Sequence, residues 1–130
     1  MGASQSIPIT AGDVTFEGAM SFGDALITPI INSHQNNYNP TGLQDTIILD
    51  ISSSGNFNIT GIMKPIPNGT RILYVFNIGT NNIVFKDNDA GSLPENRILL
   101  GSNKSIQAGE GLILVYDNAE TIWKVPAINI

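Results

Sequence analysis

The chain has 130 residues, 42% of them hydrophobic, and carries a net charge of −5 with no cysteine. This size and apolar content suffice for one domain with a core, whereas the acidic balance and six scattered basic residues argue against a nucleic-acid partner, which needs clustered Lys and Arg. No stretch approaches the roughly 20 apolar residues of a membrane-spanning helix, and without cysteine neither disulfides nor thiolate sites can form.

Residues 1–37 are expected to form an extended N-terminal arm. Their apolar residues lie among small ones without a sustained period, although Ile7–Thr10 and Asp13–Glu17 each fit a short strand. The stretch Ala19–Ile31 is broken by an acidic residue and a proline and follows no basic residue, which argues against a secretory signal. Met1–Ser6 fits the loose myristoylation pattern, which is common by chance, and we interpret it as a small, flexible terminus.

A linker is predicted after the arm. The run His34–Gly42 consists largely of polar amides and ends in a proline and a glycine, which are strong breaks in local structure. We therefore place a domain boundary here, with a β-sandwich domain at residues 38–130.

The domain is predicted to consist of short strands. Arg71–Ile78 is continuously apolar after its first residue, so both of its faces should be covered, and it is the best candidate for the centre of the core. The short turn after it predicts an antiparallel hairpin with Ile83–Lys86, and a terminal hairpin joins Leu112–Tyr116 to Thr121–Val125. The other predicted strands are Thr46–Ile51, Phe57–Thr60, Arg97–Leu100 and Ser105–Gln107.

The number and spacing of these strands predict the fold class. No window has the i, i+3, i+4 spacing of an amphipathic helix. Eight short strands at close spacing are typical of a sandwich or jelly roll. We therefore predict an all-β fold: an antiparallel jelly-roll-like β-sandwich with an extended N-terminal arm.

Several turn and strand segments follow one another in a distinctive order. They are Asn39–Gly42, Ile59–Ile62, Asn77–Gly79, the loop leading to Asn96 and Arg97, and Gly109–Asp117 followed by Trp123. In this order they resemble a small jelly-roll-like β domain of bacteriophage virion proteins, over about Tyr38 to Val125. In that family the domain occurs in tail fibres, head fibres and capsid decoration proteins, commonly as homotrimers. The resemblance does not extend to the arm, the segment that in such proteins tends to attach to the virion.

The scarcity of charge supports self-association. Charged residues make up 13% of the chain, about half the usual fraction, so copies of the chain are expected to cover part of its surface. We predict a non-enzymatic structural protein of a bacteriophage virion: a homotrimeric head decoration or head-fibre protein, assembled in the host cytoplasm, whose arm docks onto capsid or tail proteins. The alternatives are a tail-fibre component and a carbohydrate-binding module that contacts host surface glycans.

No residue is assigned to catalysis, to a cofactor or to a metal. His34, the single histidine, has no carboxylate or nucleophile beside it in a recognisable motif, and we interpret it as a solvent-exposed linker residue. A glycosidase needs two facing carboxylates, and the glutamates in or beside turns form no recognisable pair. They are Glu17, Glu95, Glu110 and Glu120.

The run Asp87–Gly91 places oxygen ligands at alternate positions before a glycine, as a calcium-binding loop does. Ile98 stands where that loop needs a bidentate glutamate, so we favour an Asx-rich turn. Asp87 and Asp89, with Glu95 nearby, leave a non-standard cation site open.

Four aromatic residues are candidates for a sugar-stacking platform. Tyr74, Tyr116 and Trp123 alternate with aliphatic residues within strands, so core packing is predicted for them. Tyr38 lies in the predicted linker and is expected to be exposed. With the loops Asn36–Asn39 and Asp87–Asn96 it would serve the carbohydrate-binding alternative.

Overall fold

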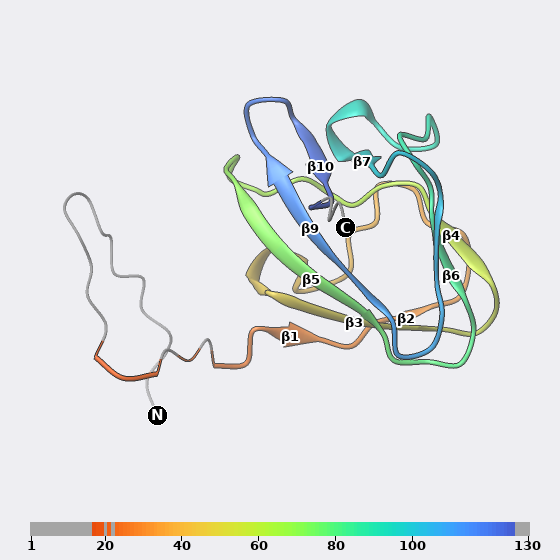
Figure 1. Ribbon diagram of the computed structural model, residues 1–130, viewed down its shortest axis with the longest axis horizontal. Coiled ribbons are helices and arrows are strands. Elements are labelled where there is room, and N and C mark those ends of the chain that lie inside the picture. The colour runs from red at the N-terminus through yellow and green to blue at the C-terminus, as the bar shows by residue number, and fades with distance from the viewer. Residues whose placement is uncertain (1–16, 20, 22, 127–130) are drawn as a thin grey trace.

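The computed structural model describes residues 17–19, 21 and 23–126, and the prediction of an all-β chain is confirmed. Figure 1 shows β3, β5 and β9 side by side, with β4 and β6 on another side of the domain. In this described part of the chain, no helix is long and apolar enough to cross a bilayer. The strands are β1 (Leu26–Ile27), β2 (Ile30–Ile31), β3 (Ile48–Ser53), β4 (Phe57–Ile59), β5 (Arg71–Asn77), β6 (Ile83–Phe85), β7 (Ile98–Leu99), β8 (Lys104–Ile106), β9 (Gly111–Asp117) and β10 (Ile122–Lys124), and the 3₁₀ helices are η1 (Leu43–Asp45) and η2 (Pro94–Asn96).

The strands form two mixed sheets. A seven-stranded sheet has the order β1-β3-β5-β9-β10-β7, with β2 also paired to β3, and a three-stranded sheet has the order β4-β6-β8. Five of the eight strand pairings are parallel, namely β1–β3, β2–β3, β3–β5, β4–β6 and β7–β10. The prediction that the strands pair mainly in the antiparallel sense is therefore wrong.

The parallel pairs arise because the chain winds in successive coils, as in a β-solenoid rather than a jelly roll. Leu26 of the first coil pairs with Ile48 of the second, and Ile48 pairs with Tyr74 of the third. On another side of the coils, Gln35 pairs with Ile59 in the same parallel sense. The strands β8, β9 and β10 then add antiparallel pairs to this stack.

The predicted hairpin between β5 and β6 is wrong, because the two strands lie in different sheets. The Asn77 side chain holds the bend between them: its Oδ1 accepts the Gly79 N–H at 3.0 Å, and its Nδ2 donates to the carbonyls of Asn81 and Ile106, both at 2.8 Å. A Cβ atom on Gly79 would lie 2.9 Å from the Ser52 Cβ, so this bend packs closely on the preceding coil. The chain therefore continues into the next side of the coil.

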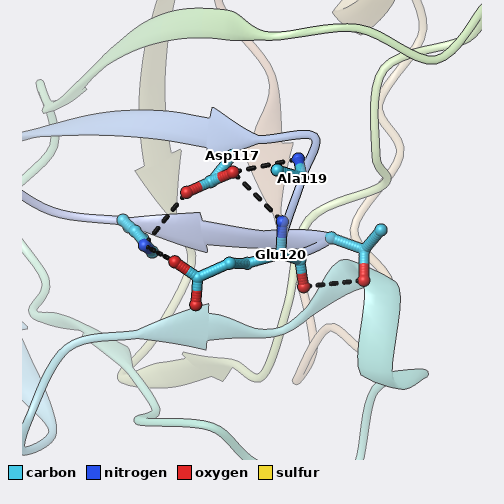
Figure 2. Close-up of polar contacts among 5 residues, drawn as sticks. Asp117, Ala119 and Glu120 are labelled. Carbon is cyan, nitrogen blue, oxygen red and sulfur yellow. Dashed lines mark hydrogen bonds and ion pairs between the residues drawn. The ribbon is translucent and has the colours of Figure 1, made fainter.

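The predicted terminal hairpin is confirmed by β9 and β10, in which Tyr116 pairs with Trp123. Figure 2 shows how the carboxylate of Asp117 closes its turn. One oxygen accepts the N–H of Ala119 at 3.0 Å and that of Glu120 at 3.1 Å. An aspartate that binds the backbone of its own turn fixes the loop without a glycine.

The predicted linker is packed into the domain. Tyr38 is only 7% exposed, and the Asn37 side-chain oxygen accepts hydrogen bonds from Leu93 N at 2.8 Å and Asn96 Nδ2 at 2.9 Å. β1 and β2, which lie within the predicted arm, pair with β3. The sheet therefore extends to the N-terminal side of the predicted boundary. The strands expected at Ile7–Thr10 and Asp13–Glu17 lie outside the described residues, apart from Glu17.

The core is built from the inward-facing residues of both sheets. Trp123 is fully buried, its ring meets that of Tyr116 edge-on with centroids 5.1 Å apart, and its Nε1 donates to the Ile62 carbonyl at 2.9 Å. The other buried hydrophobic residues are Ile31, Tyr38, Leu43, Leu49, Ile51, Ile59, Leu73, Val75, Ile83, Phe85, Ile98, Ile106 and Leu114.

Burial of Tyr38 predicts a loss of stability in alkali. Burial raises its pKa to about 12, so the folded state favours the neutral phenol. The resulting contribution to stability is complete below about pH 10 and is lost as the pH rises toward 12. We expect Tyr38→Phe to lose less thermal stability than the wild type between about pH 9 and pH 11.5, measured by circular dichroism. Equal losses in the two proteins would contradict this.

Candidate interaction surface

The second face of β5 is exposed and apolar. Ile72, Tyr74 and Phe76 are 50%, 38% and 40% exposed, while Leu73 and Val75 between them are buried. Within a single chain the second face of this strand is therefore not covered, and the prediction that Tyr74 lies in the core is wrong. Large apolar side chains remain in contact with solvent along the middle of the sheet.

Neighbouring strands extend this apolar surface. The register places Leu26 of β1, Ile48 of β3, Tyr74 of β5 and Ile113 of β9 in one row across four strands. Residues paired in register point to the same face of a sheet, so this row belongs to a single surface. We call it the outer face and define it by Leu26, Ile30, Ile48, Ile72, Tyr74, Phe76 and Ile113.

The outer face has a covered glycine beside Phe76 and two open hollows beside Tyr74. Phe76 lies opposite Gly111 in register, and a Cβ atom on Gly111 would lie 2.8 Å from the Phe76 ring, so this ring covers the glycine. An open hollow of about 310 Å³ adjoins Tyr74, Phe76 and Ile113, and a second of about 540 Å³ adjoins Ile72 and Tyr74. Both have mainly apolar walls.

The outer face carries one acidic residue within it and an ion-paired group on its β10 side. Asp50 pairs with Phe76 on the β3 side, and Lys124 pairs with Val115 on the β10 side. Lys124 Nζ lies 3.0 Å from an Asp117 oxygen and also contacts Glu120 (Figure 2). The Lys124 hydrogen bond, helped by the backbone N–H of Glu120, lowers the pKa of Asp117, and the bond to Glu120 raises the pKa of Lys124. The ions at this corner thus neutralise one another in part.

The two aspartates of the candidate cation loop accept hydrogen bonds from backbone N–H groups. One Asp87 oxygen accepts the N–H of Leu100 at 2.8 Å and that of Gly101 at 3.1 Å, and an Asp89 oxygen accepts the N–H of Gly91 at 2.7 Å. The Asp89 contact is that of an Asx turn, as the favoured interpretation expected. The Asp87 contacts instead hold the loop to the segment that follows β7. Within the part of the chain that the structure describes, no three His, Cys, Asp or Glu residues cluster as metal ligands would.

His34 is exposed, as predicted, and has a structural contact. Its Nδ1 accepts the N–H of Asn58 at 2.9 Å, and its ring meets Phe57 edge-on. Thus His34 holds the first coil against β4.

The glutamates are also engaged locally. An oxygen of Glu110 accepts the Gln107 N–H at 2.8 Å, Glu120 contacts Lys124, and the backbone carbonyl of Glu95 accepts the Tyr116 hydroxyl at 2.9 Å. The structure brings no two of these residues together with His34 or with the cation loop in a shared site.

The aromatic and loop candidates are distributed differently from the prediction. Tyr116 and Trp123 are core residues, as expected, whereas Tyr38 is buried rather than exposed. The polar loops also bind each other: Thr60 Oγ1 donates to Asn36 Oδ1 at 2.6 Å and lies 2.7 Å from Ser92 Oγ. Of the four aromatic candidates, the one exposed on a broad surface is therefore Tyr74, which sequence patterning assigned to the core.

The outer face could not be identified from hydrophobic patterning. An apolar strand with two covered faces and one whose second face binds a partner have the same pattern, and only the low charge of the chain indicated an associating surface. No family model, curated protein or solved structure matches this chain.

Proposed function

We propose that this chain is a non-enzymatic structural protein that works by self-association: a homotrimeric head decoration or head-fibre protein of a bacteriophage virion. The observation that carries the proposal is the exposed outer face, where apolar side chains from four neighbouring strands form one surface. Monomeric proteins rarely expose a continuous apolar patch of more than a few hundred Å². The trimeric state and the location on a phage particle are proposed from the sequence resemblance to phage virion domains.

Attachment to the particle is assigned to the N-terminal segment. Because β1 and β2 are built into the sheet, the proposed attachment segment is shorter than the predicted arm and comprises residues 1–23. Several copies of such a segment on a symmetric particle bind with avidity even when each contact is weak. Capsid or tail proteins are the proposed partners, and the virion is the proposed location.

The mass of the chain in solution tests this proposal. We expect light scattering to give three times the chain mass of 13.9 kDa, unchanged across about a hundredfold dilution, because hydrophobic burial holds the copies together. A mass that falls to one chain on modest dilution would contradict the homotrimer.

A carbohydrate-binding module or tail-fibre component is the second candidate. The exposed ring of Tyr74 beside an open hollow favours it, since aromatic faces stack on sugars. A monomer that binds a host glycan through this ring would replace the first proposal. The outer face offers few polar groups to orient a sugar, which is why self-association ranks first.

A further inference from the structure

The pair Tyr74–Ile113 lies at the middle of the outer face. The seven-stranded sheet has β5 and β9 at the centre of its strand order, and these two residues are paired in register across them. Apolar residues continue across the strands from Tyr74 to Ile48 and Leu26, and along β5 to Ile72 and Phe76 on either side of Tyr74. Lys124 lies on the β10 side of the face, whereas Asp50 pairs with Phe76 and is a diagonal neighbour of Tyr74.

We infer that copies of this chain pack against one another through the outer face, with Tyr74 closest to the symmetry axis. This inference rests on the proposed self-association and names its contact. In a closed assembly that uses one continuous face, the axis passes close to that face, so the centre of the face meets the same residues of its copies. Tyr74 of one copy therefore approaches Tyr74 of the next.

The exposed area is of the size that such a contact needs. Six outer-face side chains are between 38% and 67% exposed. At roughly 150–250 Å² for a large side chain, they leave on the order of 500 Å² uncovered. That area falls within the roughly 300–600 Å² of the largest apolar patch on a typical monomer, a patch that is often functional. It supplies more than half of the roughly 800 Å² per partner of a stable interface, whose remainder comes from the surrounding polar rim.

The chemistry of the face favours another copy over other occupants. A largely apolar face with the ion-paired group of Lys124, Asp117 and Glu120 at its β10 side resembles the apolar core and polar rim of protein interfaces. An anionic membrane or a nucleic acid attracts clustered Lys and Arg, whereas Lys124 is already bound to Asp117 and Glu120. Every copy carries the same apolar surface, so contact between copies removes this surface from water and requires no other protein.

Single cysteines locate the contact, because the natural chain has none. Tyr74→Cys is compared with Leu93→Cys, which replaces a leucine that is 55% exposed in the loop before η2 and outside both sheets. Each variant is oxidised with copper phenanthroline at low protein concentration and analysed on a non-reducing gel. We expect Tyr74→Cys to form at least about tenfold more covalent dimer, because neighbouring copies hold its thiols at high effective concentration.

A charge at the same place gives an independent readout. Tyr74→Glu brings carboxylates together at the centre of the contact and is expected to reduce the mass in solution to that of one chain, while Leu93→Glu keeps the wild-type mass. Tyr74 is partly exposed, so circular dichroism of Tyr74→Glu should retain the β spectrum.

The outcomes separate this inference from the proposed function. If the wild type is trimeric but Tyr74→Cys cross-links no better than Leu93→Cys and Tyr74→Glu stays trimeric, the outer face is not the contact and the structural role stands. If the wild type is monomeric, the proposed function itself fails. A dimeric wild type that cross-links through Tyr74→Cys supports the contact and overturns the trimer.

Discussion

Replacing Trp123 by alanine is expected to lower the free energy of unfolding by about 3–5 kcal/mol, a large part of the stability of an ordinary domain. Its ring is fully buried and packs edge-on against Tyr116. Its Nε1 also satisfies the Ile62 carbonyl of an earlier coil at 2.9 Å, so the substitution leaves both a cavity and an unpaired buried acceptor. Urea unfolding at one fixed protein concentration, followed by circular dichroism, measures the loss.

Trp123→Phe is the matched control. It keeps an aromatic ring in the core but removes the hydrogen bond to Ile62, and we expect a loss of about 1–3 kcal/mol. Circular dichroism is needed because Trp123 is the single tryptophan of the chain. A loss below about 1 kcal/mol for Trp123→Ala would show that this site is not the packed centre described here.

Asn77→Ala is expected to cost about 3 kcal/mol, more than its small change in volume suggests. The side chain is 2% exposed and makes three hydrogen bonds, to Gly79 N, Asn81 O and Ile106 O. The last bond joins β5 of the large sheet to β8 of the small one. Alanine would leave one donor and two acceptors without their partner where water has little access, and denaturant unfolding would report the cost.

Asn81→Ala provides the comparison. It removes one hydrogen bond, from Nδ2 to the Ser53 carbonyl at 2.8 Å, at a half-buried position, and should cost about 1 kcal/mol. Hydrogen exchange adds a spatial readout: Asn77→Ala should speed exchange in β8 as well as in the turn. If both variants lose the same stability, Asn77 does not connect the sheets in the way proposed.

The positions of the strands were largely predictable from the sequence, but their partners were not. β5 lies within its predicted run and β3 and β9 overlap theirs, and the terminal hairpin follows from a short loop between two such runs. Parallel pairing between coils joins residues far apart in sequence, such as Ile48 and Tyr74, and leaves no local signal. The turn after β5 was interpreted as a hairpin because nothing local reveals the packing of Gly79 on Ser52.

The sequence indicated that an associating surface exists, but not which residues form the candidate surface. Low charge indicated that copies cover part of the protein, but patterning assigned Tyr74 to the core and Tyr38 to the surface, and both assignments are wrong. Tyr38 is buried because the polar amides before it are satisfied by a distant loop, as in the bonds from Asn37 to Leu93 and Asn96. Because these hydrogen-bond partners are distant in the chain, the sequence of the polar run alone resembles that of an exposed linker.

The widths of the strand pairings also determine how the domain bears a mechanical load. β1 pairs with β3 through two residues, β3 with β5 through four, and β5 with β9 through six. Tension applied at the N-terminal side therefore meets the narrowest pairing first and the broadest last (Figure 1). A domain held by that end would first lose the pairings of β1 and β2 with β3, and with them Leu26 and Ile30 of the outer face, while the wider β3–β5 and β5–β9 pairings hold.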